Sequence, residues 1–373
     1  MTETPAGLET TPLHPLHLEL KARMVPFAGY DMPVQYPAGI LKEHLHARAS
    51  AGLFDVSHMG QVVLRGDGVA QALETLVPGE IQALKPGRMR YTLFLDEHGG
   101  ILDDLMVTNM GDHLFLVVNA ACKQADIAHM RDRLPPGIEV GHLEDRALLA
   151  LQGPLASAVL ARLDPDAATM KFMSARTVEI DGAEMLVTRS GYTGEDGYEI
   201  SLPAGRAEAF ARRLLAEPEV EAVGLGARDS LRLEAGLCLY GHDIDRTTTP
   251  VEANLSRAIG KRRRAEGGFP GAEVVLRQIA EGPARLRVGI LPEGRAPARE
   301  HTPITAAGAD GGETIGEVTS GGFGPTVNRP VAMGYVPAAR AAAGTPLTLL
   351  VRGKALPARV AELPFVAQRY YRG

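Results

Sequence analysis

The chain has 373 residues, of which 45% are hydrophobic and 23% charged, and its formal net charge is −6 at pH 7. This length is too great for one compact core and favours two or three domains. The acidic balance excludes a general affinity for nucleic acid or an anionic membrane surface.

Cysteine usage and hydropathy exclude further classes of protein. The two cysteines, Cys122 and Cys238, lie far apart in the chain, which is not a disulfide framework or a paired-cysteine metal motif. The longest apolar run, 114–118, is much too short to span a membrane. Residues 1–11 have neither the apolar core of a signal peptide nor the arginines of a transit peptide. We therefore expect a soluble cytoplasmic protein.

Strand-like and helix-like segments alternate through the first two-thirds of the chain. Apolar patterning predicts strands over 61–64, 90–95, 101–109, 113–118, 184–188 and 198–202. Helical spacing predicts helices over 69–76, 123–134, 155–163 and 207–216. Because the connections between strands are short, we expect a mixed α+β fold with mostly antiparallel pairing.

The pattern changes near residue 265. Short strands are predicted over 285–291, 314–320, 332–336 and 347–351, separated by stretches rich in glycine and proline. Such spacing is typical of a small all-β barrel or sandwich of about 90 residues. The segment 321–325 has neither the lysine nor the following helix of a phosphate loop, and we interpret it as a turn.

The segment 189–199, with the sequence RSGYTGEDGYE, is the most informative stretch of the chain. Its three glycines tolerate unusual backbone angles and let the chain approach a flat ligand closely. Glu199 heads the next apolar run, so its carboxylate is expected on a rigid strand edge. There it could accept two parallel N–H bonds from a guanidine-like edge such as a pterin ring. The alternative is a glycine-rich hairpin with solvated acids.

Eight segments, in this order, resemble the motifs of the aminomethyltransferases, the T-proteins of the glycine cleavage system. They run from near the N-terminus to the chain end at 54–59 (FDVSHM), 99–105 (GGILDDL), 149–154 (LALQGP), 189–199, 227–236 (ARDSLRLEAG), 245–252, 331–337 (VAMGYVP) and 370–371. Singly each is a weak pattern, but eight in the same order are a specific one.

The resemblance implies a fold and a reaction. It implies a multidomain α+β folate-binding fold with antiparallel sheets around a central channel, followed by a C-terminal all-β barrel. We place two interleaved α+β subdomains in 1–265, a connecting segment in 266–282 and the barrel in 283–373. The implied enzyme transfers the one-carbon unit of an aminomethyl group from the lipoyl arm of H-protein to tetrahydrofolate. Ammonia is released and 5,10-methylenetetrahydrofolate is formed.

The resemblance also implies site residues. Asp104 matches the catalytic aspartate, as a base or as an orienting carboxylate. If 101–109 is a strand, Asp103 and Asp104 point to opposite faces, so only one of them can enter the site. Without the resemblance, two aspartates after Gly-Gly would be read as turn chemistry. The matching folate-binding and substrate-contacting positions are Glu199, Arg228, Asn119, Tyr91, Met59 and Tyr370.

The remaining features concern partners and alternatives. The basic run Lys261, Arg262, Arg263 and Arg264 is either a solvated linker or a contact for the acidic H-protein. Arg228 begins a predicted helix with Leu231 and Ala235 inward, where an arginine is commonly a salt-bridge partner. No metal is expected, because His44, His46 and His58 lack ligand spacing. The competing functions are a related folate-dependent demethylase or oxidoreductase portion, and a non-catalytic folate-binding protein.

Overall fold

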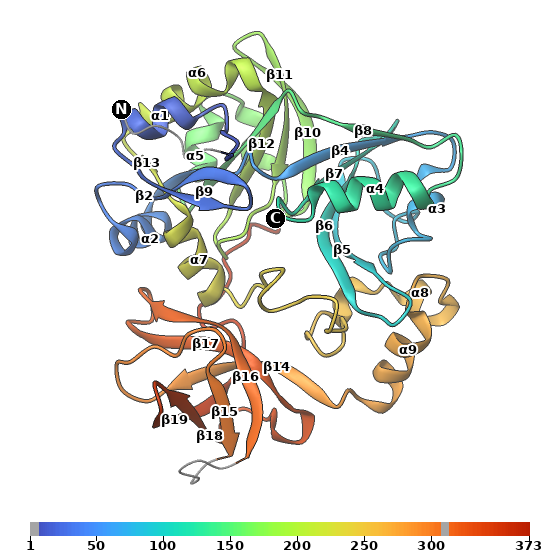
Figure 1. Ribbon diagram of the computed structural model, residues 1–373. Helices are drawn as coiled ribbons and strands as arrows, with labels where there is room; N and C mark the ends of the chain where they lie inside the picture. Colours follow the sequence, from blue (N-terminus) through green and yellow to red (C-terminus); the bar gives the residue numbers. More distant parts are fainter. Residues whose placement is uncertain (1–6, 307–312) are drawn as a thin grey trace.

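The computed structural model describes residues 7–306 and 313–373 and consists of an α+β region joined to a closed β-barrel (Figure 1). This confirms the predicted fold class. Among the described residues, no helix is long and apolar enough to cross a membrane.

An 11-stranded sheet organises the α+β region, in the order β13-β3-β9-β12-β11-β10-β5-β6-β7-β4-β8. The bounds are β3 Ala51–Asp55, β4 Gly60–Arg65, β5 Arg88–Leu95, β6 Ile101–Asn109, β7 Leu114–Val118, β8 Glu139–His142, β9 Arg146–Gln152, β10 Ser174–Ile180, β11 Ala183–Arg189, β12 Gly197–Pro203 and β13 Val220–Ala222. Only one residue pair, Ser174 with Arg88, joins β10 to β5. The sheet therefore consists of a six-stranded and a five-stranded half. Its pairing is antiparallel, as predicted, except between β13 and β3.

Each half of the sheet has its own helices and apolar core. In the six-stranded half, α1 (His14–Glu19), α5 (Ala156–Ala161) and α6 (Ala204–Leu215) cover a core that contains Tyr198 and Phe210. In the other half, α3 (Val69–Leu73) and α4 (Lys123–Arg133) cover a second core. The predicted inward face of α4 is confirmed, since Ile127 and Met130 are 3% and 0% exposed.

Among the described residues, a separate two-stranded sheet and four α-helices complete the part before the barrel: β1 (Arg23–Phe27), β2 (Tyr30–Gln35), α2 (Ile40–Ala49), α7 (Leu225–Glu234), α8 (Lys261–Glu266) and α9 (Ala272–Glu281). Helix α7 packs against β16 and β17 of the barrel. In α7 the predicted inward residues are buried, with Leu231 at 0% and Ala235, at its C-cap, at 2% exposure. Helix α9 and the segment 238–259 pack on the face of β5 turned away from α4.

The barrel closes in the order β14-β17-β16-β15-β18-β19. Its strands are β14 Arg285–Pro292, β15 Pro303–Ala306, β16 Thr314–Gly324, β17 Arg329–Pro337, β18 Pro346–Val351 and β19 Lys354–Ala361. The turn predicted over 321–325 is wrong, because β16 continues to Gly324. A Cβ on Gly321 would lie 2.1 Å from the Ala298 carbonyl oxygen, so this glycine permits close chain approach inside a strand.

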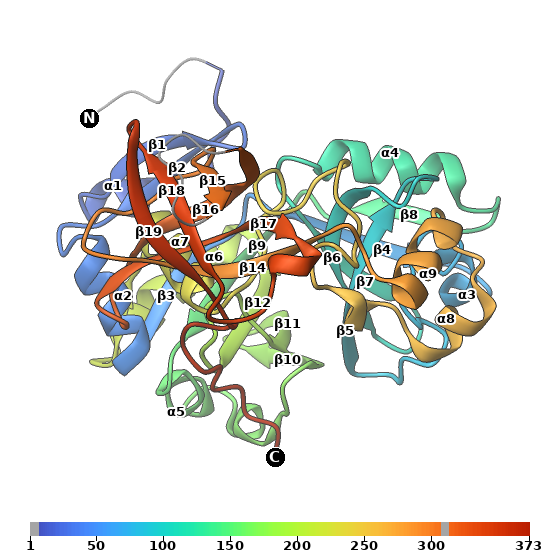
Figure 2. The same ribbon diagram turned by 90° about the horizontal axis from the view of Figure 1, so that it is seen from below.

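The C-terminal segment leaves the barrel and returns to the α+β region, where it ends near α5 (Figure 2). The backbone N–H of Arg369 donates to the Gly194 carbonyl at 2.8 Å, and the Phe172 N–H donates to the Tyr371 carbonyl at 2.7 Å. The last residues of the chain therefore pack directly against the glycine-rich segment 189–199.

Candidate functional site

The β6 strand carries the two aspartates on opposite faces, as the strand period predicts. Asp103 lies across from Phe94 and Asp104 across from Leu93 on β5. Asp103 is fully buried, on the side of the sheet that α4 covers. Asp104 is half-buried on the other face, together with Tyr91. Of the two carboxylates, therefore, only Asp104 is open to a ligand.

Asn119, immediately after β7, connects the two aspartates through its amide. Its Nδ2 donates to Asp104 Oδ1 at 2.7 Å and to Asp103 Oδ1 at 2.9 Å. Its backbone N–H donates to Asp103 Oδ2 at 3.0 Å. The predicted pocket residue Asn119 is thus a direct hydrogen-bond partner of the predicted catalytic carboxylate.

The surroundings of Asp104 favour its neutral form. Burial and then the nearby charge of Asp103 raise the pKa of Asp104 to about 7, while hydrogen bonds from Tyr91 and Asn119 act in the opposite direction. The carboxyl group can therefore gain or lose a proton close to neutral pH, as a general acid or base must.

Glu199 and Arg228 form a second charged group. Glu199 lies in β12, which pairs with β11 and β9, so it occupies an interior strand and not a strand edge. The Ser190 hydroxyl donates to Glu199 Oε2 at 3.3 Å. The Arg228 guanidinium lies over the Tyr192 ring, 4.7 Å from its centroid. Burial raises the pKa of Glu199, and the charge of Arg228 opposes this shift.

The two charged side chains are not satisfied by the protein itself. No hydrogen bond or salt bridge within residues 7–306 and 313–373 engages the Arg228 guanidinium, and Glu199 has only the long contact from Ser190. Burial lowers the pKa of Arg228, with Glu199 acting in the opposite direction. A half-buried carboxylate and guanidinium with free hydrogen-bonding capacity fit a polar ligand placed between them.

Tyr192 connects these two groups. Burial raises the pKa of its hydroxyl, and the charges of Arg232, Asp104 and Arg228 also act on that hydroxyl. The hydroxyl donates to the Cys238 carbonyl. The sequence pattern does not single out Tyr192, although it lies inside the glycine-rich segment, because its partners Arg228 and Cys238 are distant in the chain.

Met59 and Tyr370 have other neighbours than the charged side chains described above. Met59 packs against the apolar cluster around Phe54 and Leu148. Tyr370 stacks on Phe172, with ring centroids 4.0 Å apart and an interplanar angle of 7°. In the described part of the chain, no hydrogen bond or ring contact joins Tyr370 to Asp104, Glu199 or Arg228. All seven predicted residues are nevertheless half-buried.

A buried ionic network, which the sequence did not reveal, holds the glycine-rich segment in place. Arg48 on α2 donates to Glu195 Oε1 at 2.8 Å and to Glu234 Oε2 at 3.1 Å. His44 lies 3.1 Å from the same Glu234 oxygen, and Arg369 donates to Glu195 at 2.7 Å. Glu234 also accepts N–H bonds from the β16–β17 turn. The network therefore joins α2, α7, the barrel and the chain end.

The basic run 261–264 is mostly engaged within the protein. Arg262 pairs with Glu74 at 2.5 Å, Arg263 is buried and donates to the Glu74 carbonyl at 2.6 Å, and Arg264 donates to the Ser256 carbonyl. Lys261 and Arg264 are the exposed members. These contacts favour a structural role for the two central arginines.

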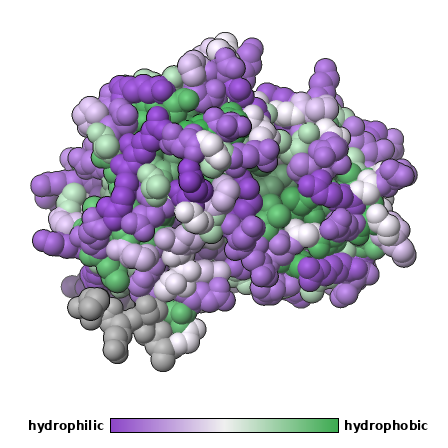
Figure 3. Space-filling model, turned by 90° about the horizontal axis from the view of Figure 1, so that it is seen from above, coloured by the Kyte–Doolittle hydropathy of each residue, from purple (hydrophilic) through white to green (hydrophobic). Residues whose placement is uncertain are grey.

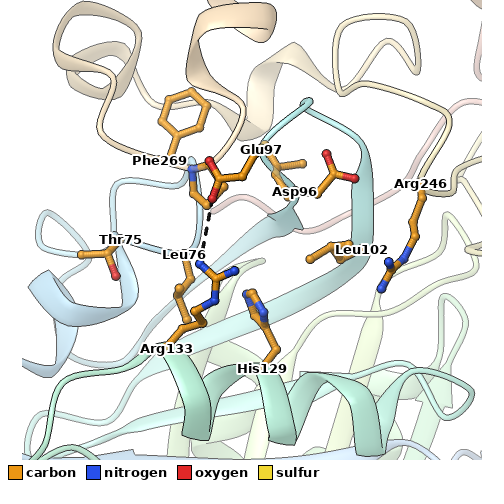
Figure 4. A pocket seen from close by; sticks show the side chains of 11 residues that line it. Thr75, Leu76, Asp96, Glu97, Leu102, His129, Arg133, Arg246 and Phe269 are labelled. Carbon is orange, nitrogen blue, oxygen red and sulfur yellow. Dashed lines mark ion pairs between the residues drawn. The ribbon is translucent and has the colours of Figure 1, made fainter.

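A cavity of about 490 Å³ lies behind β6 and contains none of the predicted site residues. The β5–β6 hairpin contributes Asp96 and Glu97, α4 contributes His129 and Arg133, and Phe269 closes one side (Figure 4). Glu97 and Arg133 pair loosely across it at 3.9 Å. On the face seen from above, the larger group of hydrophobic residues lies in the right-hand part of the view, and smaller groups lie among hydrophilic residues on the left (Figure 3). Within residues 7–306 and 313–373, no cluster of three metal-ligating side chains is present.

Comparisons with known proteins agree with this architecture. Residues 13–263 match the family model described as the GCVT N-terminal domain, and residues 285–367 match the glycine cleavage T-protein C-terminal barrel domain. A mitochondrial aminomethyltransferase of Dictyostelium discoideum is 45% identical, with 97% of this chain and 94% of that protein covered. The one from Flaveria pringlei is 47% identical, with 98% and 92% covered. The crystal structure of the glycine cleavage system aminomethyltransferase T from Bartonella henselae is 47% identical, has a TM-score of 0.92, and is matched over 98% of this chain and 99% of that one.

Proposed function

The chain belongs to the glycine cleavage T-protein family, and we propose how its residues divide the work of that family's reaction. It is an aminomethyltransferase: it passes the one-carbon unit of the aminomethyl group on the lipoyl arm of H-protein to tetrahydrofolate. Ammonia is released and 5,10-methylenetetrahydrofolate is formed. Identity of 45% over nearly the whole length of an aminomethyltransferase carries this conclusion and disfavours a demethylase or a non-catalytic folate-binding protein.

Glu199 and Arg228 bind the polar end of tetrahydrofolate in this proposal. The support is their unused hydrogen-bonding capacity, together with the rigid placement of Glu199 in an interior strand. A fixed carboxylate accepts two parallel N–H bonds from the guanidine-like edge of a pterin. Arg228, held over Tyr192, supplies donors to the acceptor atoms of the ring.

Asp104 manages the proton of the attacking folate nitrogen. An amine that adds to carbon must lose a proton, and a carboxyl group with a pKa of about 7 can accept it at neutral pH. The Asn119 amide fixes Asp104 Oδ1 by a hydrogen bond of 2.7 Å. In the same proposal Tyr91 and Met59 line the site. Tyr370, brought back by the C-terminal segment, borders the substrate entrance.

The division of the chain follows the reaction. We assign folate binding and catalysis to 1–265, a linking role to 266–282 and closure of the site to the barrel in 283–373.

The H-protein, with its lipoyl arm, is the partner of the family. The exposed Lys261 and Arg264 are proposed to steer this acidic partner. A cytoplasmic location also remains a proposal, and the relatives named above carry the word mitochondrial.

The deciding assay mixes the purified chain with aminomethyl-loaded H-protein and tetrahydrofolate, and follows methylenetetrahydrofolate and ammonia together. We expect both products to form only when folate is present. For the role of Asp104, D104N should lower kcat by about 10²-fold or more and still bind folate. D67N, at an exposed acid, is the matched control. Folate binding without either product in the unaltered chain would overturn the activity, and a near-normal kcat in D104N would overturn only the role of Asp104.

A further inference from the structure

Behind the catalytic strand, on the face that α4 covers, two buried carboxyl groups meet. Asp103 on β6 is 0% exposed and Asp126 on α4 is 3% exposed, and they lie within hydrogen-bonding range of each other. One Asp126 oxygen, Oδ2, is buried and has no donor among the described residues. Two ionised carboxylates in this arrangement would repel each other strongly without water to screen them. A single proton shared between the two carboxyl groups removes that repulsion.

The hydrogen-bond pattern identifies which of the two groups carries the proton. Asp103 accepts both the backbone N–H of Asn119, at 3.0 Å, and its side-chain amide, at 2.9 Å. These two donors stabilise a negative charge on Asp103. Among the described residues Asp126 Oδ2 has no donor, so the protonated form of Asp126, with its O–H directed at Asp103, is the consistent one. In agreement, burial and then the charge of Asp103 hold the pKa of Asp126 well above its usual range.

We propose that Asp126 is a positioning residue for Asp104 and acts as a neutral acid through Asp103 and Asn119. The neutral Asp126 holds Asp103, Asp103 holds both N–H groups of Asn119, and the Asn119 amide donates to Asp104 Oδ1 at 2.7 Å. This inference deepens the proposed function and rests on the role of Asp104 given there. Asp103 and Asp126 also have a second role. Their single negative charge, which is fixed on Asp103, opposes ionisation of Asp104 and keeps the Asp104 proton exchangeable near neutral pH.

The other groups around the carboxyls do not compete for this proton near neutral pH. Burial raises the pKa of Cys122, before α4, and of Tyr240, in the segment after α7, to well above neutral. The same holds for Tyr91 on β5, for Tyr192 and for Cys238, whose pKa is about 12. Burial lowers the pKa of His129, which lies on α4 against the Phe94 ring. Among these groups of the described residues, Asp104 is therefore the one whose pKa lies close to neutral.

The first test observes the proton directly, without a turnover measurement. Infrared or ¹³C-carboxyl NMR spectra of the full-length protein at pH 7.5 should show a buried protonated carboxyl signal that D126N removes and D132N, at an exposed aspartate of the same helix, retains. D104N should also retain it, because the signal does not depend on the role of Asp104. Absence of any protonated carboxyl signal that D126N removes would overturn the proposal.

The second test separates positioning from simple support of the fold. D126N, whose amide also donates to Asp103, should keep kcat within about twofold and leave the midpoint of the acid limb of kcat/KM unchanged. D103N should lower that midpoint by about one pH unit, because it removes the charge beside Asp104. D126L should lower kcat about tenfold or more with little change in KM for tetrahydrofolate. An equal midpoint shift in D126N and D103N, or a normal kcat in D126L, would refute the positioning role. Normal turnover of D104N would instead refute the role of Asp104, while the carboxyl signal would stand.

Discussion

Replacing Asp104 by asparagine should abolish most activity and at the same time stabilise the folded protein at high pH. The pKa of Asp104 rises from 3.8 to about 7, chiefly through burial. A group whose pKa is raised on folding favours the folded state only at low pH, and this contribution is lost as the pH rises to the folded pKa. Ionised Asp104 therefore destabilises the fold above about pH 7.

The size of the effect follows from the shift. Each pKa unit corresponds to about 1.4 kcal/mol, so the full shift sets a ceiling of about 4 kcal/mol at pH 8. Asp104 is half-buried and partly solvated, and its ionised form keeps the hydrogen bond from Asn119. We therefore expect D104N to raise the free energy of unfolding by about 1–3 kcal/mol at pH 8 and by almost nothing at pH 4.

Urea unfolding at pH 4, 6 and 8, followed by circular dichroism, measures this difference. The exposed substitution D67N is the control and should be within about 0.5 kcal/mol of the original protein at every pH. A D104N protein that is less stable at pH 8, or whose stability difference does not change with pH, would refute the assignment of a raised pKa to this carboxyl.

Three further predictions concern the ionic network, the folate site and the partner surface. R48M should lower the free energy of unfolding by about 3–5 kcal/mol in urea titrations, because it leaves Glu195 and Glu234 buried without their shared cation. The control R65M, at an exposed arginine, should lower it by less than about 0.5 kcal/mol, and equal losses in the two variants would contradict the network. E199Q should weaken tetrahydrofolate binding about tenfold or more, as measured by calorimetry, and E179Q, at an exposed glutamate, is the control. If E199Q binds tetrahydrofolate as tightly as the original protein, Glu199 is not part of the folate site. The double variant K261S/R264S should raise KM for H-protein about threefold or more at low salt, and this difference should shrink as salt is added. The control is K42S, at an exposed lysine. If the double variant and K42S have the same KM at low salt, the two positions do not contact H-protein.

Local sequence patterns determined many of the elements. The strand at 101–109 and the α4 helix were predicted nearly to the residue, because alternation and helical spacing are properties of the segment itself. The opposite orientation of Asp103 and Asp104 followed from the strand period alone. Predictions failed where packing overrides local signals. The glycines in 321–324 predicted a turn, yet this segment completes a barrel strand, and strand β19 was not predicted.

The sequence by itself determined the fold class, the family resemblance and the types of residue that the chemistry needs. Only the tertiary structure placed Glu195 and Glu234 in the interior beside Arg48, made Asn119 the bridge between two aspartates, and set Asp126 against Asp103. The physical reason is that burial and pairing of charges depend on residues distant in the chain. In the sequence, Asp126 is one more acid on a helix; in the folded protein, α4 brings it out of water and against a second carboxyl group.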